Sequence, residues 1–305
     1  MPKRLKIGLI GTDSSHAIAF ARLLNVPSDP FHVAGGEVML SYPGGSPDFA
    51  LSASRVEEYM ELLRTQYGVA RAGTPEEVAQ YCDAVLLTAA DGRAHRELFA
   101  RIAPYGKPVF IDKPLALSYR EASEIRRISE ERNVPVMSCS ALRYAEYLVR
   151  ELEQRERADI AGADVYGPMP IEPTQSYYFW YGNHTAEMLF ALMGPGCVQC
   201  SVVSAREHEF ITGLWRDGRI GTIRGNRCGI GRFGALAHRA DASVSIDIGA
   251  GRKPFYASML ERVMSMFRTG EPQLGWNEML ETVRFLEAAE ASRLRGTAVS
   301  LAEVD

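Results

Sequence analysis

The sequence predicts an α/β protein in which an N-terminal Rossmann-type parallel sheet is followed by a C-terminal α/β domain with an open, mostly antiparallel sheet. The chain has 305 residues, and at ~150 residues per domain this length suggests about two domains. Short apolar segments alternate with helical patterns in the first 140 residues, whereas strand-like runs gather in the second half. We therefore predict a nucleotide-binding domain over 1–140 and a substrate-binding and oligomerisation domain over 141–305.

The first 140 residues carry the signals of alternating strands and helices. Ser54 with Glu57, and Ser118 with Glu121, have the spacing of a capping box at a helix start. The expected strands are Leu5–Ile10, Glu37–Ser41, Ala84–Leu87, Val109–Ile111 and Val134–Met137. The expected helices are Ser15–Leu24, Arg55–Tyr67, one that starts at Thr74-Pro75, Gly92–Ile102, and one from Ser118 to about Glu131. Ligands of such a sheet bind beyond the carboxyl ends of its strands, so we look for chemistry there.

The second half is expected to form a mostly antiparallel sheet with flanking helices. Asp217-Gly218 lies between two strand-like runs and is a hairpin signal. Met259, Val263 and Met266 form an apolar stripe, which is typical of a helix that packs into a core. The expected strands are Cys200–Ala205, Phe210–Trp215, Arg219–Arg224 and Ser243–Ile248, and the expected helices are Ala186–Met193, Phe255–Arg268 and Glu278–Arg295.

The composition argues against nucleic acids and membranes as partners. The net charge is −4 and the sequence has no long run of Lys and Arg, so the electrostatic footprint of a nucleic-acid-binding protein is missing. No apolar run approaches the ~20 residues that span a bilayer. The basic start is followed by only four apolar residues, which is too short for a signal peptide. We expect a cytoplasmic protein.

The cysteines and one histidine do not suggest a disulfide framework or a metal site. The cysteine count of five is odd, and the C-x-x-C pair Cys197 and Cys200 begins a β-rich run, where residues three apart face opposite sides. We interpret both as ordinary cysteines. His208 stands between Glu207 and Glu209, but on a strand the two carboxylates share one face and the histidine the other. We therefore expect no metal.

The turn after the first strand is a degraded dinucleotide fingerprint. The G-x-G-x-x-G spacing keeps Gly11, but Asp13 and His16 stand at the second and third glycine positions. Asp13 adds bulk and negative charge where a diphosphate would approach, although the following helix N-terminus still attracts anions. Two interpretations stay open: this turn contacts a nucleotide, or Asp13 or Ser14 bonds the first amides of the helix.

The end of the second strand lacks the carboxylate that NAD enzymes usually place there for the adenosine ribose. Ser41 could instead bond a ribose or a 2′-phosphate, and Tyr42 could stack on adenine. The alternative is that the Pro-Gly-Gly sequence that follows is simply a turn.

Several later motifs occur in a defined order along the chain. They are Ala90-Asp-Gly-Arg-Ala-His95, Tyr105-Gly-Lys-Pro-Val-Phe-Ile-Asp112-Lys113-Pro114, Gly182-Asn-His184-Thr-Ala-Glu187, the hairpin Trp215–Thr222, and Leu286–Ser292 followed by Gly296-Thr-Ala-Val. With this ordered set the chain resembles the Gfo/Idh/MocA oxidoreductases, whose corresponding segments include T-P-N-x-x-H, A-G-K-x-V-x-x-E-K-P and G-x-H-x-x-D. The resemblance covers nearly the whole chain.

The resemblance implies hydride transfer between NAD or NADP and a hydroxyl carbon of a sugar, polyol or related compound. The family's E-K-P lysine falls on Lys113 and its catalytic histidine on His184, and the Lys113–Pro114 bond is expected to be cis by analogy. Partial desolvation beside a cationic nicotinamide would lower the pKa of Lys113, so that it could exchange a proton with the substrate. His184 would be its proton partner.

Further residues are candidate contacts of the substrate and the cofactor. Tyr178 and Trp180 are expected to bind the sugar-like substrate with Lys113 and His184, unless these aromatic residues belong to the core. The candidate cofactor contacts are Gly11, Thr12, Asp13, Ser14, His16, Ser41, Tyr42, Ala90, His95, Asp112 and Pro114, with His95 in a packing role. The chain departs from the family at Trp180, where an Asp is common, and at Asp91-Gly92, where the family has Pro-Asn.

Two functions follow from these observations. The first is an NAD(P)-dependent oxidoreductase that uses Lys113 and His184. The second is a non-redox protein of the same fold that binds a small polar ligand, which the altered glycine fingerprint and the missing ribose carboxylate favour. In either case the apolar, Gly-rich strands between Val198 and Ile248 predict a homodimer or homotetramer.

Overall fold

The computed structural model describes residues 4–229 and 231–304, and the chain forms two compact units that are discontinuous in sequence. The first unit consists of the chain up to Ala116, Glu121–Cys139 and Tyr256–Gly275. The second consists of Leu117–Arg120, Ser140–Phe255 and the chain from Trp276 onward. The segment 256–275, which the sequence led us to assign to the second domain, therefore packs with the first unit.

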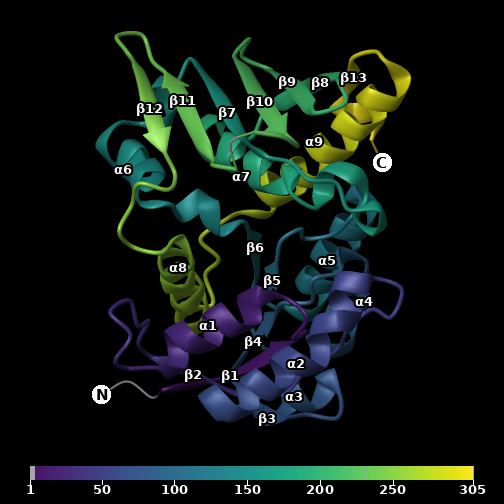
Figure 1. Cartoon of the computed structure of the whole chain (residues 1–305), viewed down its shortest axis with the longest axis vertical. Coiled ribbons are helices and arrows are strands. Elements are labelled where there is room, and N and C mark those ends of the chain that lie inside the picture. Colours follow the sequence, from purple (N-terminus) through teal and green to yellow (C-terminus); the bar gives the residue numbers. More distant parts are fainter. Residues whose placement is uncertain (1–3, 230, 305) are drawn as a thin grey trace. The chain divides into compact units, whose positions relative to one another are not determined.

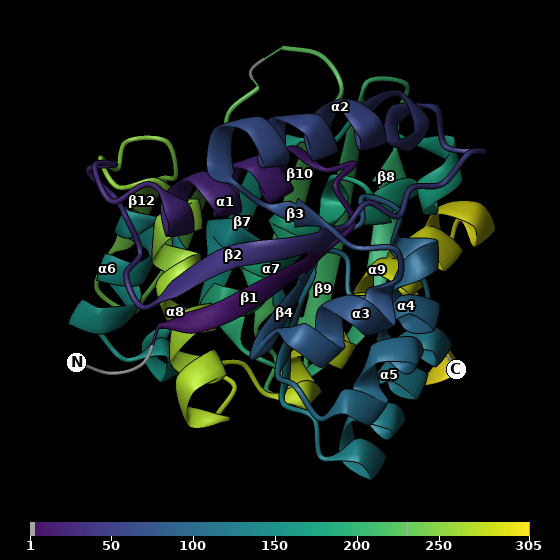
Figure 2. The same cartoon turned by 90° about the horizontal axis from the view of Figure 1, so that it is seen from below.

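The first unit is built on a six-stranded sheet in the order β3-β2-β1-β4-β5-β6, in which the paired strands are parallel. Helices α1 and α2 cover one face of this sheet, and α3, α4 and α5 cover the other (Figure 2). The strands are β1 (Leu5–Ile10), β2 (Gly36–Tyr42), β3 (Ala70–Arg71), β4 (Ala84–Leu87), β5 (Val109–Asp112) and β6 (Val136–Cys139). The helices are α1 (Ser15–Asn25), α2 (Ala50–Tyr67), α3 (Pro75–Tyr81), α4 (His95–Ile102) and α5 (Tyr119–Arg132). This doubly wound arrangement confirms the predicted Rossmann-type sheet.

Helix α2 begins five residues before the position that its capping signal indicated. Its N-cap is Phe49, which makes no side-chain cap hydrogen bond. Ser54 lies inside the helix, and Glu57 forms an exposed ion pair with Arg71. The prediction of a capping box at Ser54 was wrong, because a serine followed three residues later by a glutamate also occurs on the exposed face of a helix.

Helix α8 (Phe255–Thr269) adds a layer to the first unit from far along the sequence. Its apolar stripe is buried, as predicted, and includes Met259, Val263 and Met266. At its end the guanidinium of Arg268 donates a hydrogen bond to the carbonyl of Ala34, just before β2. Burial of this stripe against the Rossmann unit explains why the helix packs with the first unit and not with the strands that precede it in sequence.

The second unit contains a seven-stranded sheet in the order β12-β11-β7-β10-β9-β8-β13, in which only β7 and β10 pair in parallel among the described strands (Figure 1). The strands are β7 (Gly162–Pro168), β8 (Cys197–Ser204), β9 (His208–Trp215), β10 (Ile220–Asn226), β11 (Gly234–His238), β12 (Ser243–Asp247) and β13 (Val299–Ser300). Its main helices are α6 (Glu146–Gln154), α7 (Gly182–Met193) and α9 (Trp276–Arg295). The mostly antiparallel sheet and the turn at Asp217-Gly218 are confirmed, whereas β7, β11 and β13 were missed. None of the helices in the described part of the chain combines the length and apolarity that crossing a bilayer requires.

The two cysteines of the C-x-x-C sequence are both buried thiols in β8. A register shift between Cys197 and Gln199 rotates the strand locally, so the prediction that Cys197 and Cys200 face opposite sides was wrong. Burial raises the pKa of the Cys197 thiol to about 12 and that of Cys200 further. Both thiols are therefore protonated and unreactive near neutral pH.

Gly11 follows β1 directly and packs closely against the backbone that follows β4. Its φ is +92°, and an added Cβ would lie 2.3 Å from the backbone nitrogen of Ala89, which follows β4. Gly68, at the C-terminus of α2, has a φ of +70° but no atom within 4 Å of an added Cβ. Both positions favour glycine by their backbone conformation, but only Gly11 is also sterically closed to a side chain.

We expect Gly11→Ala to lower the free energy of unfolding by ~3 kcal/mol or more, because backbone strain and overlap with Ala89 add. Gly68→Ala, the matched control, carries only the backbone cost of ~1–2 kcal/mol. Urea unfolding followed by circular dichroism measures both values. Equal losses for the two variants would contradict the close packing of Gly11 against Ala89.

Candidate functional site

The turn between β1 and α1 is closed by its own backbone. The amide of Gly11 donates to the carbonyl of Tyr42 at 2.9 Å, and the amide of Thr12 donates to the carbonyl of Pro43 at 2.8 Å. The hydroxyl of Thr12 donates to the carbonyl of Val56 in α2. The first amides of this turn are thus bonded to the end of β2 and to the residue that follows it, and they do not form an open nest for a diphosphate.

Ser14 is the cap of helix α1. Its hydroxyl accepts a hydrogen bond from the amide of His16 at 3.2 Å. Of the two residues that the sequence offered for this cap, Asp13 and Ser14, the structure selects Ser14.

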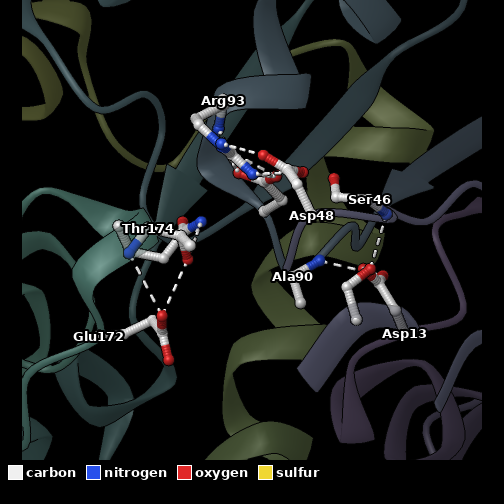
Figure 3. Close-up of polar contacts among 10 residues, drawn as sticks. Asp13, Ser46, Asp48, Ala90, Arg93, Glu172 and Thr174 are labelled. Atoms are coloured by element: carbon white, nitrogen blue, oxygen red, sulfur yellow. Dashed lines mark hydrogen bonds and ion pairs between the residues drawn. The ribbon is translucent and has the colours of Figure 1, made fainter. Parts of the chain in front are cut away.

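Asp13 instead joins the turn after β1 to helix α2 and to the turn after β4, at the carboxyl edge of the parallel sheet (Figure 3). One carboxylate oxygen accepts from the hydroxyl of Ser52 at 2.6 Å, and the other accepts from the amide of Ala90 at 3.0 Å. The hydroxyl of Ser52 also accepts from the amide of Ser46 at 2.8 Å. Asp13 is fully buried, and this burial raises its pKa although its hydrogen bonds act in the opposite direction.

His16, at the third glycine position of the fingerprint, links two other elements of the first unit. Its Nδ1 donates to the carboxylate of Asp112 at the end of β5, and its Nε2 lies 2.8 Å from the hydroxyl of Tyr256 in α8. Burial raises the pKa of Asp112, but His16 and the neighbouring Lys113 outweigh this effect and hold the pKa below its usual value. The side chain of His16 thus fixes Asp112 as an acceptor next to Lys113.

The two residues predicted to receive the adenosine differ in exposure. Ser41 is fully buried and its hydroxyl has no hydrogen-bond partner, so it does not present a donor to a ribose or a 2′-phosphate. That prediction was wrong, because the Ser41 side chain is enclosed in the interior of the first unit. Tyr42 is half-buried, and its carbonyl accepts a hydrogen bond from the amide of Gly11.

An ion triad, which sequence reasoning missed, lies beside this turn. Asp91 is buried and accepts from the amide and the guanidinium of Arg93, which gives the short helix Gly92–Ala94 its cap. The other side of the same guanidinium donates to both carboxylate oxygens of Asp48, at 2.8 and 3.0 Å (Figure 3). The signal available in the sequence was the departure from Pro-Asn at Asp91-Gly92.

Lys113 and Pro114 form a cis peptide at the carboxyl end of β5, as the resemblance implied. Burial lowers the pKa of the Lys113 ammonium, and the carboxylate of Asp112 opposes this shift. The ring of His95 lies between two carbonyl oxygens, 2.8 Å from that of Pro114 and 2.9 Å from that of Ala89. His95 is fully buried and contacts the Lys-Pro turn through the carbonyl of Pro114, which agrees with the packing role expected for it.

In the second unit, Ser140 positions the ring of His184. Its hydroxyl lies 2.7 Å from Nδ1 of His184 and accepts from the amide of Leu142. Nε2 of the half-buried imidazole therefore points away from Ser140.

Behind His184 is a buried ionic network. Arg143 donates to Glu187, one turn after His184 on α7, and to Glu278 at the start of α9. Burial raises the pKa of Glu187, partly offset by Arg143 and by the amide of Ser140. Because Glu187 contacts both Arg143 and Ser140, the network fixes the position of the group that orients His184.

The aromatic residues predicted to contact a substrate separate into two kinds. Tyr178 is fully buried and donates its hydroxyl to the buried Glu209 at 2.8 Å, so its assignment to the substrate was wrong. Trp180 is half-buried and stacks at a tilt on Tyr181, whose ring lies edge-on to His184 at a centroid distance of 5.4 Å. Trp180 thus belongs to the aromatic surroundings of His184, whereas Tyr178 belongs to the core.

No group of three or more potential metal ligands occurs in the described ranges 4–229 and 231–304. Nδ1 of His208 lies 3.1 Å from the side-chain oxygen of Asn226. Glu209 is buried among the hydroxyls of Tyr178 and Ser204 and the guanidinium of Arg227. These partners account for the charged pattern at 207–209.

The comparisons with known proteins agree with this architecture. Residues 45–139 match the model of the GFO_IDH_MocA oxidoreductase family, which is described as having an NAD-binding Rossmann fold. This match confirms the predicted resemblance in the first unit. No curated protein matches the chain significantly.

Solved structures share the fold over the whole chain. Myo-inositol 2-dehydrogenase from Lactobacillus plantarum superposes with a TM-score of 0.78 at 15% identity, over 98% of this chain and 99% of that one. Scyllo-inositol dehydrogenase from Lactobacillus casei gives a TM-score of 0.78 at 13% identity, over 99% and 100%. GenD2 from gentamicin A biosynthesis, solved in complex with NAD, gives a TM-score of 0.75 at 19% identity, over 98% and 97%.

The stability of the Asp13 contacts should depend on pH with a defined sign. The folded pKa lies above the unfolded value of about 3.8, so the native state takes up a proton first as the pH falls. The free energy of unfolding of the wild type, minus that of Asp13→Asn, should therefore rise as the pH falls through the folded pKa, and level off below 3.8. Urea titrations at several pH values measure this difference.

Asp13→Ala is the control for the hydrogen bonds themselves. It leaves the amide of Ala90 without its acceptor and should be less stable than Asp13→Asn by ~1–3 kcal/mol at every pH. A wild-type advantage that shrinks on acidification would contradict the raised pKa of Asp13.

Proposed function

We propose that this chain is an NAD(P)-dependent oxidoreductase that transfers hydride to or from a hydroxyl carbon of a sugar, a polyol or a derivative of these. The observation that carries the proposal is Lys113, which directly follows the carboxyl end of β5 beside the buried Asp112 and whose pKa is lowered by burial. The match of residues 45–139 to an NAD-binding oxidoreductase family supports the reaction class. The names of the two inositol dehydrogenases with the same fold support the substrate class.

The first unit fits a dinucleotide in most respects. The sheet keeps the crossover between β1 and β4 at which such cofactors bind, and Gly11 leaves no side chain at the turn. When bound, NAD or NADP supplies the hydride acceptor or donor. We assign its contacts to the β1–α1 turn beside Gly11, to Tyr42 at the end of β2, and to Ala90 and Pro114 after β4 and β5.

Lys113 is the group that exchanges the hydroxyl proton in this proposal. An alcohol loses a proton as hydride leaves its carbon, so oxidation needs a base at the oxygen. A lowered pKa makes the neutral amine of Lys113 more accessible near neutral pH. The carboxylate of Asp112, which is hydrogen-bonded to His16, lies close to Lys113. Its negative charge opposes the lowering of the Lys113 pKa.

His184 is the second proton-handling group in the proposal. Its Nδ1 is taken by Ser140, so Nε2 is the nitrogen that would meet a substrate hydroxyl. Trp180 and Tyr181 provide aromatic surfaces of the kind that pack against sugar rings. Tyr178 has no part in this assignment, because it is buried against Glu209.

The second candidate function is non-redox binding of a small polar ligand on the same fold. It is favoured by the buried carboxylate of Asp13 at the second glycine position and by the bonded amides of Gly11 and Thr12. Binding of a sugar-like ligand with no response to any dinucleotide would distinguish it from the oxidoreductase.

Lys113→Met should abolish turnover, with a loss of about 10²–10⁴-fold, which is typical when a proton-transfer group is removed. Lys107→Met is the matched control, because Lys107 lies at the opposite end of β5. Both should keep the circular dichroism of the wild type. Absorbance of NADH or NADPH with a panel of inositols, aldoses and polyols measures the rates. Equal turnover in Lys113→Met and the wild type would remove Lys113 from the mechanism.

We also assign a self-association surface to the second unit. Helices α7 and α9 pack against the sheet, while side chains of its opposite face are exposed. The strand register places Val203, Phe210, Arg224 and Tyr166 side by side on this exposed face. Its apolar members have exposed fractions between 37% and 71%, and they are Tyr166, Val203, Phe210, Leu214, Ile220 and Leu236. An apolar face of this extent on a sheet fits a second copy of the chain, in a homodimer or homotetramer.

The double variant Phe210→Glu with Ile220→Lys should convert this assembly to monomers, because it places charges in a desolvated interface. Leu294→Lys replaces an even more exposed apolar residue, on α9, and should leave the assembly unchanged. Light scattering after size-exclusion chromatography at micromolar concentration measures the mass. A monomeric wild type would contradict this assignment.

A further inference from the structure

Two polar connections in the first unit cross the carboxyl end of β1. Strands β2, β1 and β4 are neighbours in this order, so contacts between the loop after β2 and the turn after β4 pass over β1. The inner connection runs from Ser46 through Ser52 and Asp13 to Ala90. The outer connection is the ion pair between Asp48 and Arg93, beside the inner one in Figure 3. The diphosphate of a dinucleotide would lie at this end of the sheet.

The charges at this edge are unbalanced toward negative. The carboxylates of Asp48 and Asp91 both bond the guanidinium of Arg93, and that of Asp13 accepts from the amide of Ala90 in the same turn after β4. The amides of Gly11 and Thr12 are bonded to carbonyls at the end of β2 and of the residue that follows it. An incoming diphosphate therefore needs a positive group, and among the contacts described for this edge Arg93 supplies it.

The two partners of Arg93 differ in how firmly they are held. The side chain of Asp91 is 3% exposed and also accepts the amide of Arg93, so it is part of the fixed turn. The side chain of Asp48 is 68% exposed and lies on a loop, and that of Arg93 is 39% exposed. The contact with Asp48 is the one that an incoming anion can replace.

We propose that Arg93 is the diphosphate-binding side chain of this protein, exchanging Asp48 for the diphosphate of the cofactor while it keeps Asp91. The inference rests on the proposed function, since it concerns the same dinucleotide. A guanidinium binds two phosphate oxygens with the paired geometry that it now offers to the two oxygens of Asp48. Asp48 then acts as an internal competitor that weakens cofactor binding.

Isothermal calorimetry with NADH, NADPH and ADP-ribose tests the exchange without relying on activity. Arg93→Met should weaken binding of all three at least tenfold, whereas Asp48→Asn should tighten it severalfold because the competitor loses its charge. Arg101→Met is the matched control, because Arg101 makes the same two-bond contact with Glu76 and its side chain is 38% exposed. It should bind like the wild type.

The outcomes separate the inference from the proposed function. If the wild type binds none of the three ligands, both are overturned. If the wild type binds and Arg93→Met binds equally well, the proposed function stands and the inference fails. If Asp48→Asn weakens binding, Asp48 is itself a ligand contact, and the exchange is overturned even when Arg93→Met is too unstable to measure.

Discussion

The buried carboxylate of Asp13 is the interaction on which the functional edge of the first unit depends. A buried charge must be hydrogen-bonded, and its partners here come from α2 and from the turn after β4. These contacts draw the loops after β1, β2 and β4 together. Gly11 makes the approach possible, because any side chain there would overlap Ala89.

This constraint changes how the unit can bind a dinucleotide. In the usual fingerprint, the second glycine lets the diphosphate reach the backbone of the turn. Here the same position holds a side chain that bonds the protein to itself, and the amides next to it are bonded to carbonyls. An anion must then be bound by a side chain, and Arg93 lies in the turn after β4, at the carboxyl edge of the sheet. The end of β5, to which we assign the proposed chemistry, is less altered, since the Lys113–Pro114 turn is present and His95 contacts the carbonyl of Pro114.

The sequence was most informative where signals are local. Strands β1, β4 and β5, the cap at Thr74 and the Lys-Pro turn all have short-range signatures, and the structure contains each of them. Contacts between distant residues were not predictable. Ser52 lies 39 residues after Asp13, and the return of α8 to the first unit depends on packing rather than on any local pattern.

The errors have the same origin. Ser41 and Tyr178 have polar groups that suit a ligand, but their burial is set by neighbouring elements that a single segment does not reveal. Strands β7 and β11 are rich in glycine and alanine, so they lack the β-branched pattern that marked their neighbours. The register shift after Cys197 likewise puts Cys197 and Cys200 on the same face of β8, whereas strict alternation would put them on opposite faces.

The most direct test of this account is a crystal structure of the protein grown with NADH. The account predicts a dinucleotide across the carboxyl ends of β2, β1 and β4, with its diphosphate against Arg93 and with Asp13 still bonded to Ser52 and Ala90. A diphosphate seated on the amides of the β1–α1 turn, with Asp13 displaced, would contradict it, as would a cofactor bound elsewhere.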